Sequence, residues 1–108
     1  MDYVLTKFRI KQGKLQEFKK MLNDHNARRD EIVEGLQLGK ITLECLFIES
    51  SKEGDFFFVF KKGADEGRVR EQMKTPSLPG DVRAKRLMEQ YLEDRVDMKA
   101  IATFDLAP

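Results

Sequence analysis

The hairpin that decides the fold lies in residues 41–61, ITLECLFIESSKEGDFFFVFK. Its two ends, Ile41 to Glu49 and Phe56 to Lys61, are rich in β-branched and aromatic residues, which favour strands. The residues between them, SSKEGD, are typical of a turn. We therefore predict two neighbouring antiparallel strands at the centre of the chain.

The segment before the hairpin predicts a strand and a helix. Tyr3 to Ile10 (YVLTKFRI) alternates, and its core-facing residues are expected to be Val4, Thr6, Phe8 and Ile10. From Lys14 to Leu36, apolar residues recur at alternating spacings of three and four, which is typical of a helix. We predict one long helix over this range.

The segment after the hairpin predicts a broken helical region and a last strand. Asp65 can cap a short helix, the loop with Pro76 and Pro79 interrupts it, and Asp81 can cap the next piece. Met98 to Leu106 alternates again and predicts a fourth strand. The resulting order, βαββαβ, predicts a single ferredoxin-like α+β domain over residues 1–108. Its four-stranded antiparallel sheet has strand order 4-1-3-2, with the helices on one face.

Composition excludes several classes of protein. With 41% hydrophobic and 36% charged residues and a formal net charge of +1, the chain has no overall field for nucleic acid or anionic lipid. One Cys and one His rule out an internal disulfide and a Cys/His zinc cluster within one chain. We expect no metal, no cofactor, no membrane segment and a cytoplasmic location.

The sheet face away from the helices is expected to carry many large apolar side chains. We assign to it Leu5, Lys7, Arg9, Thr42, Glu44, Leu46, Ile48, Ile101 and Thr103. The third strand adds either Phe57 and Val59 or Phe56, Phe58 and Phe60, because both its faces are apolar. Cys45 is expected to face the helices. An apolar free face of this kind usually marks an interface, and we predict a homodimer through it.

Charges on that face leave two readings open. Lys7, Arg9 and Glu44 either line a partly polar cavity between the sheets or lie solvated or paired at the rim. With Phe57 they are our candidate ligand-binding residues for a small molecule. A cavity between the sheet and the long helix is the other place for such a ligand.

His25 is the candidate acid–base residue, because histidine titrates near neutral pH and this one lies on the apolar stripe of the predicted helix. No Ser or Cys nucleophile is placed beside it by the sequence. We therefore expect a hydrogen-bonded structural histidine rather than a catalytic one.

The chain resembles short uncharacterised bacterial proteins of the dimeric α+β barrel superfamily, which also holds antibiotic-biosynthesis-type monooxygenases. The resemblance runs from Phe8 to Phe60, through the strand-turn Ile10 to Lys14, the Glu44 and Phe47 pair, and Glu49. It implies a ferredoxin-like protomer that dimerises face to face. As an alternative to simple binding, it implies a cofactor-independent monooxygenase or isomerase for a small hydrophobic substrate, oriented by Lys7, Arg9 and Glu44 with His25 as a distant base.

A minor alternative is an RNA-binding module, since the βαββαβ order and the aromatic run Phe56 to Phe60 are shared with RNA-recognition motifs. Glu53 and Asp55 would repel phosphate, so we expect nucleic acid not to be the partner.

Overall fold

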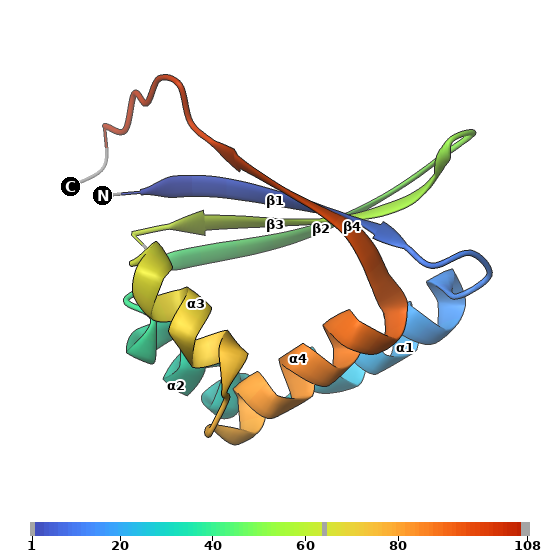
Figure 1. Cartoon of the computed structure of the whole chain (residues 1–108), viewed down its shortest axis with the longest axis horizontal. Coiled ribbons are helices and arrows are strands. Elements are labelled where there is room, and N and C mark those ends of the chain that lie inside the picture. Colours follow the sequence, from blue (N-terminus) through green and yellow to red (C-terminus); the bar gives the residue numbers. More distant parts are fainter. Residues whose placement is uncertain (1, 64, 107–108) are drawn as a thin grey trace.

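The computed structural model describes residues 2–63 and 65–106. Its sheet has four antiparallel strands in the order β2-β3-β1-β4, which confirms the predicted ferredoxin-like topology. The strands are β1 (Tyr3–Ile10), β2 (Leu43–Ser51), β3 (Gly54–Lys62) and β4 (Leu92–Lys99). The helices are α1 (Leu15–Asn26), α2 (Arg29–Leu38), α3 (Glu66–Lys74) and α4 (Pro79–Tyr91). All four helices lie on one side of the sheet (Figure 1).

The prediction of one long helix over residues 14–36 is wrong. α1 ends at Asn26, where the N–H of Arg28 donates to the His25 carbonyl at 3.1 Å in a tightened turn, and α2 begins at Arg29. The break allows α2 to pack closely on the start of α4. There a Cβ on Gly80 would lie 2.7 Å from the carbonyl oxygen of Glu31. No proline or glycine marks the break in the sequence.

The predicted cap of α3 is confirmed, and that of α4 is wrong. The carboxylate of Asp65 accepts from the N–H of Arg68 at 3.1 Å. α4 begins at Pro79 instead of after Asp81, because proline is well suited to the first turn of a helix. Asp81 lies within that turn, buried, and accepts from the side chain of Gln72 at 2.6 Å.

The fourth strand was placed too late in the chain. β4 starts directly after α4, because Leu92 pairs with Ile10 and joins the core. An irregularity opposite Lys7 to Arg9 follows, where Asp94 has a positive φ of 54°. The segment 100–106 lies beyond the strand and forms no part of the sheet.

The pairing register decides which residues face the helices. In β1 the predicted face is confirmed, and its buried residues are Val4, Thr6, Phe8 and Ile10. Phe8 pairs with Phe57, so Phe57 also faces the helices, whereas Phe56 pairs with Arg9 on the other side. The free face of β3 therefore carries Phe56, Phe58 and Phe60, the second of the two registers left open by the sequence.

The prediction for β2 is inverted. Glu44 pairs with Lys61 and Cys45 with Phe60, so Glu44 faces the helices and Cys45 the free side. The helix-facing residues of β2 are Glu44, Leu46 and Ile48, and the free-face residues are Leu43, Cys45, Phe47 and Glu49. Both sides of this strand are apolar enough that alternation alone gave the wrong choice. The free face also bears Val96 and Met98 of β4, opposite Lys7 and Leu5.

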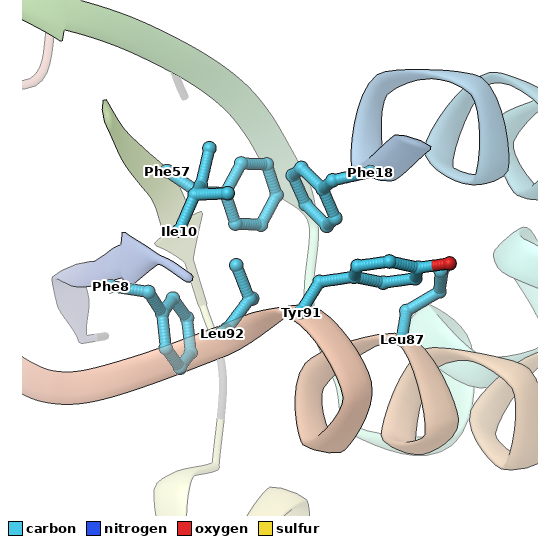
Figure 2. Close-up of a cluster of buried hydrophobic side chains, with 7 residues drawn as sticks. All are labelled: Phe8, Ile10, Phe18, Phe57, Leu87, Tyr91 and Leu92. Atoms are coloured by element: carbon cyan, nitrogen blue, oxygen red, sulfur yellow. The ribbon is translucent and has the colours of Figure 1, made fainter. Parts of the chain in front are cut away.

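The core lies between one end of the sheet and helices α1 and α4 (Figure 2). It consists of Phe8, Ile10, Phe18, Phe57, Leu87, Tyr91 and Leu92. The ring of Phe18 lies edge-on to Phe57, with centroids 5.0 Å apart, and 5.9 Å from the ring of Tyr91. This aromatic cluster fixes α1 and α4 against the sheet at that end.

Candidate functional site

A cavity of about 720 Å³ lies between the sheet and the helices. Its apolar wall comes from all four strands and all four helices, with Phe8 from β1 and Leu92 from β4. The apolar lining includes Phe18, Leu22, Ile32, Leu36, Leu46, Phe57, Val59, Val69, Met73 and Met88. The aromatic cluster forms one end of this space, and the break between α1 and α2 arranges the helices around it.

A lysine and two glutamates are among the polar residues that line the cavity, together with Thr6 of β1 and Arg95 and Asp97 of β4. Lys61 follows Phe57 and Val59 on the helix-facing side of β3, and its side chain is only 9% exposed. Its Nζ lies 3.8 Å from Oε1 of Glu66 on α3, which is an ion pair longer than a hydrogen bond. Glu44 lies opposite Lys61 in the neighbouring strand. The cavity therefore contains an ammonium group beside two carboxyls.

Burial raises the pKa of the Glu44 carboxyl above its usual value, and the charge of Lys61 opposes this only in part. A carboxyl with a raised pKa is more readily protonated, and then it can donate a hydrogen bond. Lys61 and Glu44 are thus two potential donors on one wall of the cavity.

His25 lines the same cavity from α1. Burial, with Arg83 as the next contribution, lowers the pKa of its imidazole, which favours the neutral ring at pH 7. Among the described residues, Nδ1 of His25 has no hydrogen-bond partner although the atom is buried. The hydrogen bond expected of a structural histidine is thus absent at this nitrogen.

The side-chain amide of Gln72 on α3 links α2 and α4 by hydrogen bonds on the helical side of the cavity. Nε2 of Gln72 donates to the carbonyl of Gly35 at 2.9 Å and to Asp81 at 2.6 Å, which joins α2, α3 and α4. All three residues line the cavity. Sequence reasoning did not name Gln72 or Lys61 as site residues, and it gave Asp81 only as a helix cap. Only the position of Lys61 offered a signal. It lies two residues after Val59 in a strand with both faces apolar, so it shares a face with Phe57 and Val59.

The predicted site residues separate into two groups. His25, Glu44 and Phe57 all line the cavity on the helix side. Lys7 and Arg9 lie on the free face, so the predicted grouping of Glu44 with them is wrong. Its cause is the inverted register of β2.

The free-face cations cover an aromatic ring. Nζ of Lys7 lies 4.3 Å and Cζ of Arg9 lies 4.8 Å from the centroid of Phe56. Arg9 also donates to the carbonyl of Glu53 at 2.8 Å. These contacts, and the ion pair of Arg9 with Asp94 at 3.7 Å, partly satisfy both charges. Whether Lys7 and Arg9 line a binding site stays a prediction.

No group of three or more His, Cys, Asp or Glu side chains in residues 2–63 and 65–106 could hold a metal ion. Across the same residues, no helix has the length and apolar character needed to cross a membrane.

Several solved structures have the same fold as this chain. A dimeric ferredoxin-like protein from an uncultured marine organism has a TM-score of 0.63 at 12% identity, covering 98% of this chain and 93% of that chain. A provisionally assigned antibiotic biosynthesis monooxygenase from Nitrosomonas europaea has a TM-score of 0.61 at 10% identity, covering 96% and 100%. SnoaB, a cofactor-independent oxygenase from Streptomyces nogalater, has a TM-score of 0.54 at 14% identity, covering 99% and 97%.

These likenesses confirm, for the fold, the resemblance inferred from the sequence to antibiotic-biosynthesis-monooxygenase-like proteins. No curated protein sequence matches the chain. A family model, described as a family of unknown function (DUF6176), matches residues 1–107. The chain therefore belongs to the family DUF6176, which has the fold of these dimeric ferredoxin-like proteins and oxygenases.

Proposed function

We propose that the chain forms a homodimer through its free sheet face and that each protomer binds a small, mostly apolar molecule between sheet and helices. The observation that carries the binding proposal is the cavity itself. Its volume of about 720 Å³ falls in the range of roughly 300–1,000 Å³ that is usual for small-molecule sites. Its mainly apolar wall with a few polar groups is also typical of such sites.

The polar groups indicate the chemistry of the ligand. Lys61 donates hydrogen bonds and so does Glu44 when protonated, so both favour an oxygen atom of the ligand, such as a carbonyl or hydroxyl group. A free carboxylate is less favoured, because Glu66 already lies beside Lys61. We therefore propose a flat or aliphatic molecule with an apolar body and one neutral oxygen function.

Matched ligands test this proposal. Naphthalene, 2-naphthol and 2-naphthoate share one body and differ in the oxygen function, and their binding can be followed by amide chemical shifts in NMR. We expect 2-naphthol to bind most tightly. Ala84→Trp, which fills the cavity from α4, should abolish binding, whereas Arg86→Trp on the exposed side of that helix should not. Equal shifts in both variants would refute the cavity as the site.

The dimer proposal is supported by the free face. Four of its large apolar side chains remain strongly exposed in the protomer: Leu43, Phe47, Val96 and Met98. Because no helix covers this side, a second copy is the simplest partner (Figure 1). The marine protein of the same fold is dimeric. Light scattering that gives a monomeric mass at micromolar concentration would refute the dimer.

A second candidate is catalysis, favoured by the buried and unpartnered Nδ1 of His25. A neutral imidazole can accept a proton from a carbon next to a ligand carbonyl, and the electron pair of the broken C–H bond then moves onto the carbonyl oxygen near Lys61 and Glu44. Where the ligand carries a C=C bond conjugated with this enolate, the electron pair returns from the oxygen, the far carbon of the C=C bond takes the proton from the imidazolium, and the C=C bond shifts by one position, which completes an isomerisation. SnoaB is a cofactor-independent oxygenase; on this chain the corresponding reaction would need O₂ as oxidant.

His25→Gln separates the two candidates. Loss of deuterium exchange at the carbon beside the ligand carbonyl, with ligand affinity unchanged, would support proton transfer by His25. Unchanged exchange would limit the site to binding. The cytoplasmic location and the RNA-binding alternative stay predictions from the sequence.

A further inference from the structure

The C-terminal arm, residues 100–106 (AIATFDL), exposes its apolar side chains more fully than any strand does. Ile101 is 104% exposed, Phe104 90% and Leu106 98%, relative to the reference for a free residue. The arm continues from β4 on the side of the sheet opposite the helices (Figure 1). Three large apolar side chains are therefore exposed to solvent beside the free face.

Polar contacts hold the arm in this position. The N–H of Ala100 donates to the carbonyl of Tyr3 at 3.2 Å. Further along, the carboxylate of Asp105 accepts from the hydroxyl of Tyr3 and pairs with Nζ of Lys62 at 2.6 Å. Tyr3 and Lys62 are register partners on the free face of β1 and β3. These polar contacts thus fix the arm at the margin of that face, and its three apolar side chains remain exposed to solvent.

The exposed apolar area indicates what covers the arm. Taking roughly 200 Å² for a large apolar side chain, the four strongly exposed free-face residues offer roughly 400 Å², and the three arm residues roughly 600 Å². A standard interface covers about 800 Å² on each partner, about two thirds of it apolar in homodimers. The arm more than doubles the apolar area of these four residues, to which the partly exposed Leu5, Cys45, Phe58 and Phe60 of the same face add a further share.

We propose that the C-terminal arm docks on the free sheet face of a second copy of this chain, with Ile101, Phe104 and Leu106 as anchors. In a two-fold dimer each arm makes the same contact, so one association covers both arms and both faces. The inference rests on the proposed dimer and adds to it: the arm, and not only the sheet, holds the two copies together.

The first experiment measures the dimer dissociation constant by analytical ultracentrifugation. The variant Ile101→Ser, Phe104→Ser, Leu106→Ser should weaken the dimer by at least about 1,000-fold, because each of the three anchors is worth about tenfold or more. The control Ala100→Ser, Ala102→Ser, Thr103→Ser adds three serines to the same arm and should leave the constant within about threefold.

The second experiment places a benzophenone photo-crosslinker at position 104 and mixes ¹⁴N- and ¹⁵N-labelled chains before irradiation. We expect mixed-isotope crosslinks to β2 or β4 of the other chain. Crosslinks only within one chain would overturn the proposal. A dimer unweakened by the anchor variant would overturn the arm alone, whereas a monomeric wild-type chain would overturn the proposed dimer as well.

Discussion

The strongest test of the dimer is a single substitution at Phe47, on the free face of β2. Phe47 is 55% exposed, so with roughly 200 Å² for a phenylalanine side chain it presents roughly 110 Å² to a partner. At about 25 cal/mol per Å², this area contributes about 3 kcal/mol per copy and about twice that in a symmetric dimer. Association also restricts side chains, so we take half of the total, about 3 kcal/mol or about 100-fold.

Phe47→Ser should therefore raise the dimer dissociation constant about 100-fold, as measured by sedimentation velocity over a concentration series. Its effect on the folded protomer should be small, because the side chain is already half exposed, and circular dichroism checks this. Met21→Ser on α1 is the matched control, since Met21 is 41% exposed on the opposite side of the molecule. A constant within threefold of the wild type for Phe47→Ser, or equal weakening by both variants, would refute face-to-face association.

Three further predictions concern stability and are checked by urea unfolding. Phe18→Ala and Phe57→Ala should each cost about 3–5 kcal/mol, and the double mutant should reveal a coupling of about 0.5–1.5 kcal/mol; additive costs would contradict the edge-on ring contact. Burial raises the pKa of Glu44 in the folded state, so the wild type loses stability as the pH rises above the ordinary value of 4.5. Glu44→Gln lacks this loss, so its free energy of unfolding should increase relative to that of the wild type over that range. A difference that does not change with pH would show that burial does not perturb this carboxyl. Gly80→Ala should cost about 1–3 kcal/mol, because the new Cβ meets the backbone of Glu31; an unchanged midpoint would place α2 farther from α4.

The sequence predicted the fold where local and long-range preferences agreed. β1 alternates cleanly, and its buried side chains are those expected. β2 carries apolar residues on both sides, and its two glutamates lie on opposite faces, so the polar residues do not decide the register. Glu44 pointed the wrong way because this carboxyl is half-buried beside Lys61. The alternation rule assigns polar residues of a strand to the solvent side, and it fails at Glu44 because this residue lines the cavity on the helix side.

Two other errors have tertiary causes. The helix break at Ala27 and Arg28 contains no residue that forbids a helix, and it is explained by the close packing of α2 on Gly80. The fourth strand is predicted too late in the chain, because the sequence of β4, LEDRVDMK, has little apolar alternation and the strand pairs with β1 through its backbone. For the site, His25, Glu44 and Phe57 could be named from the sequence. That they line one cavity could not be predicted, because this depends on the pairing register of β2 with β3.

Strand β4 also bears on how this molecule avoids uncontrolled growth. Five of its eight residues are charged, and the distortion at Asp94 twists the outer row of amides and carbonyls. At the β4 edge a neighbouring molecule therefore finds no flat, apolar strand to which it could add another strand. The opposite edge, β2, has no such row of charges, so any sideways growth of the sheet is expected to start there.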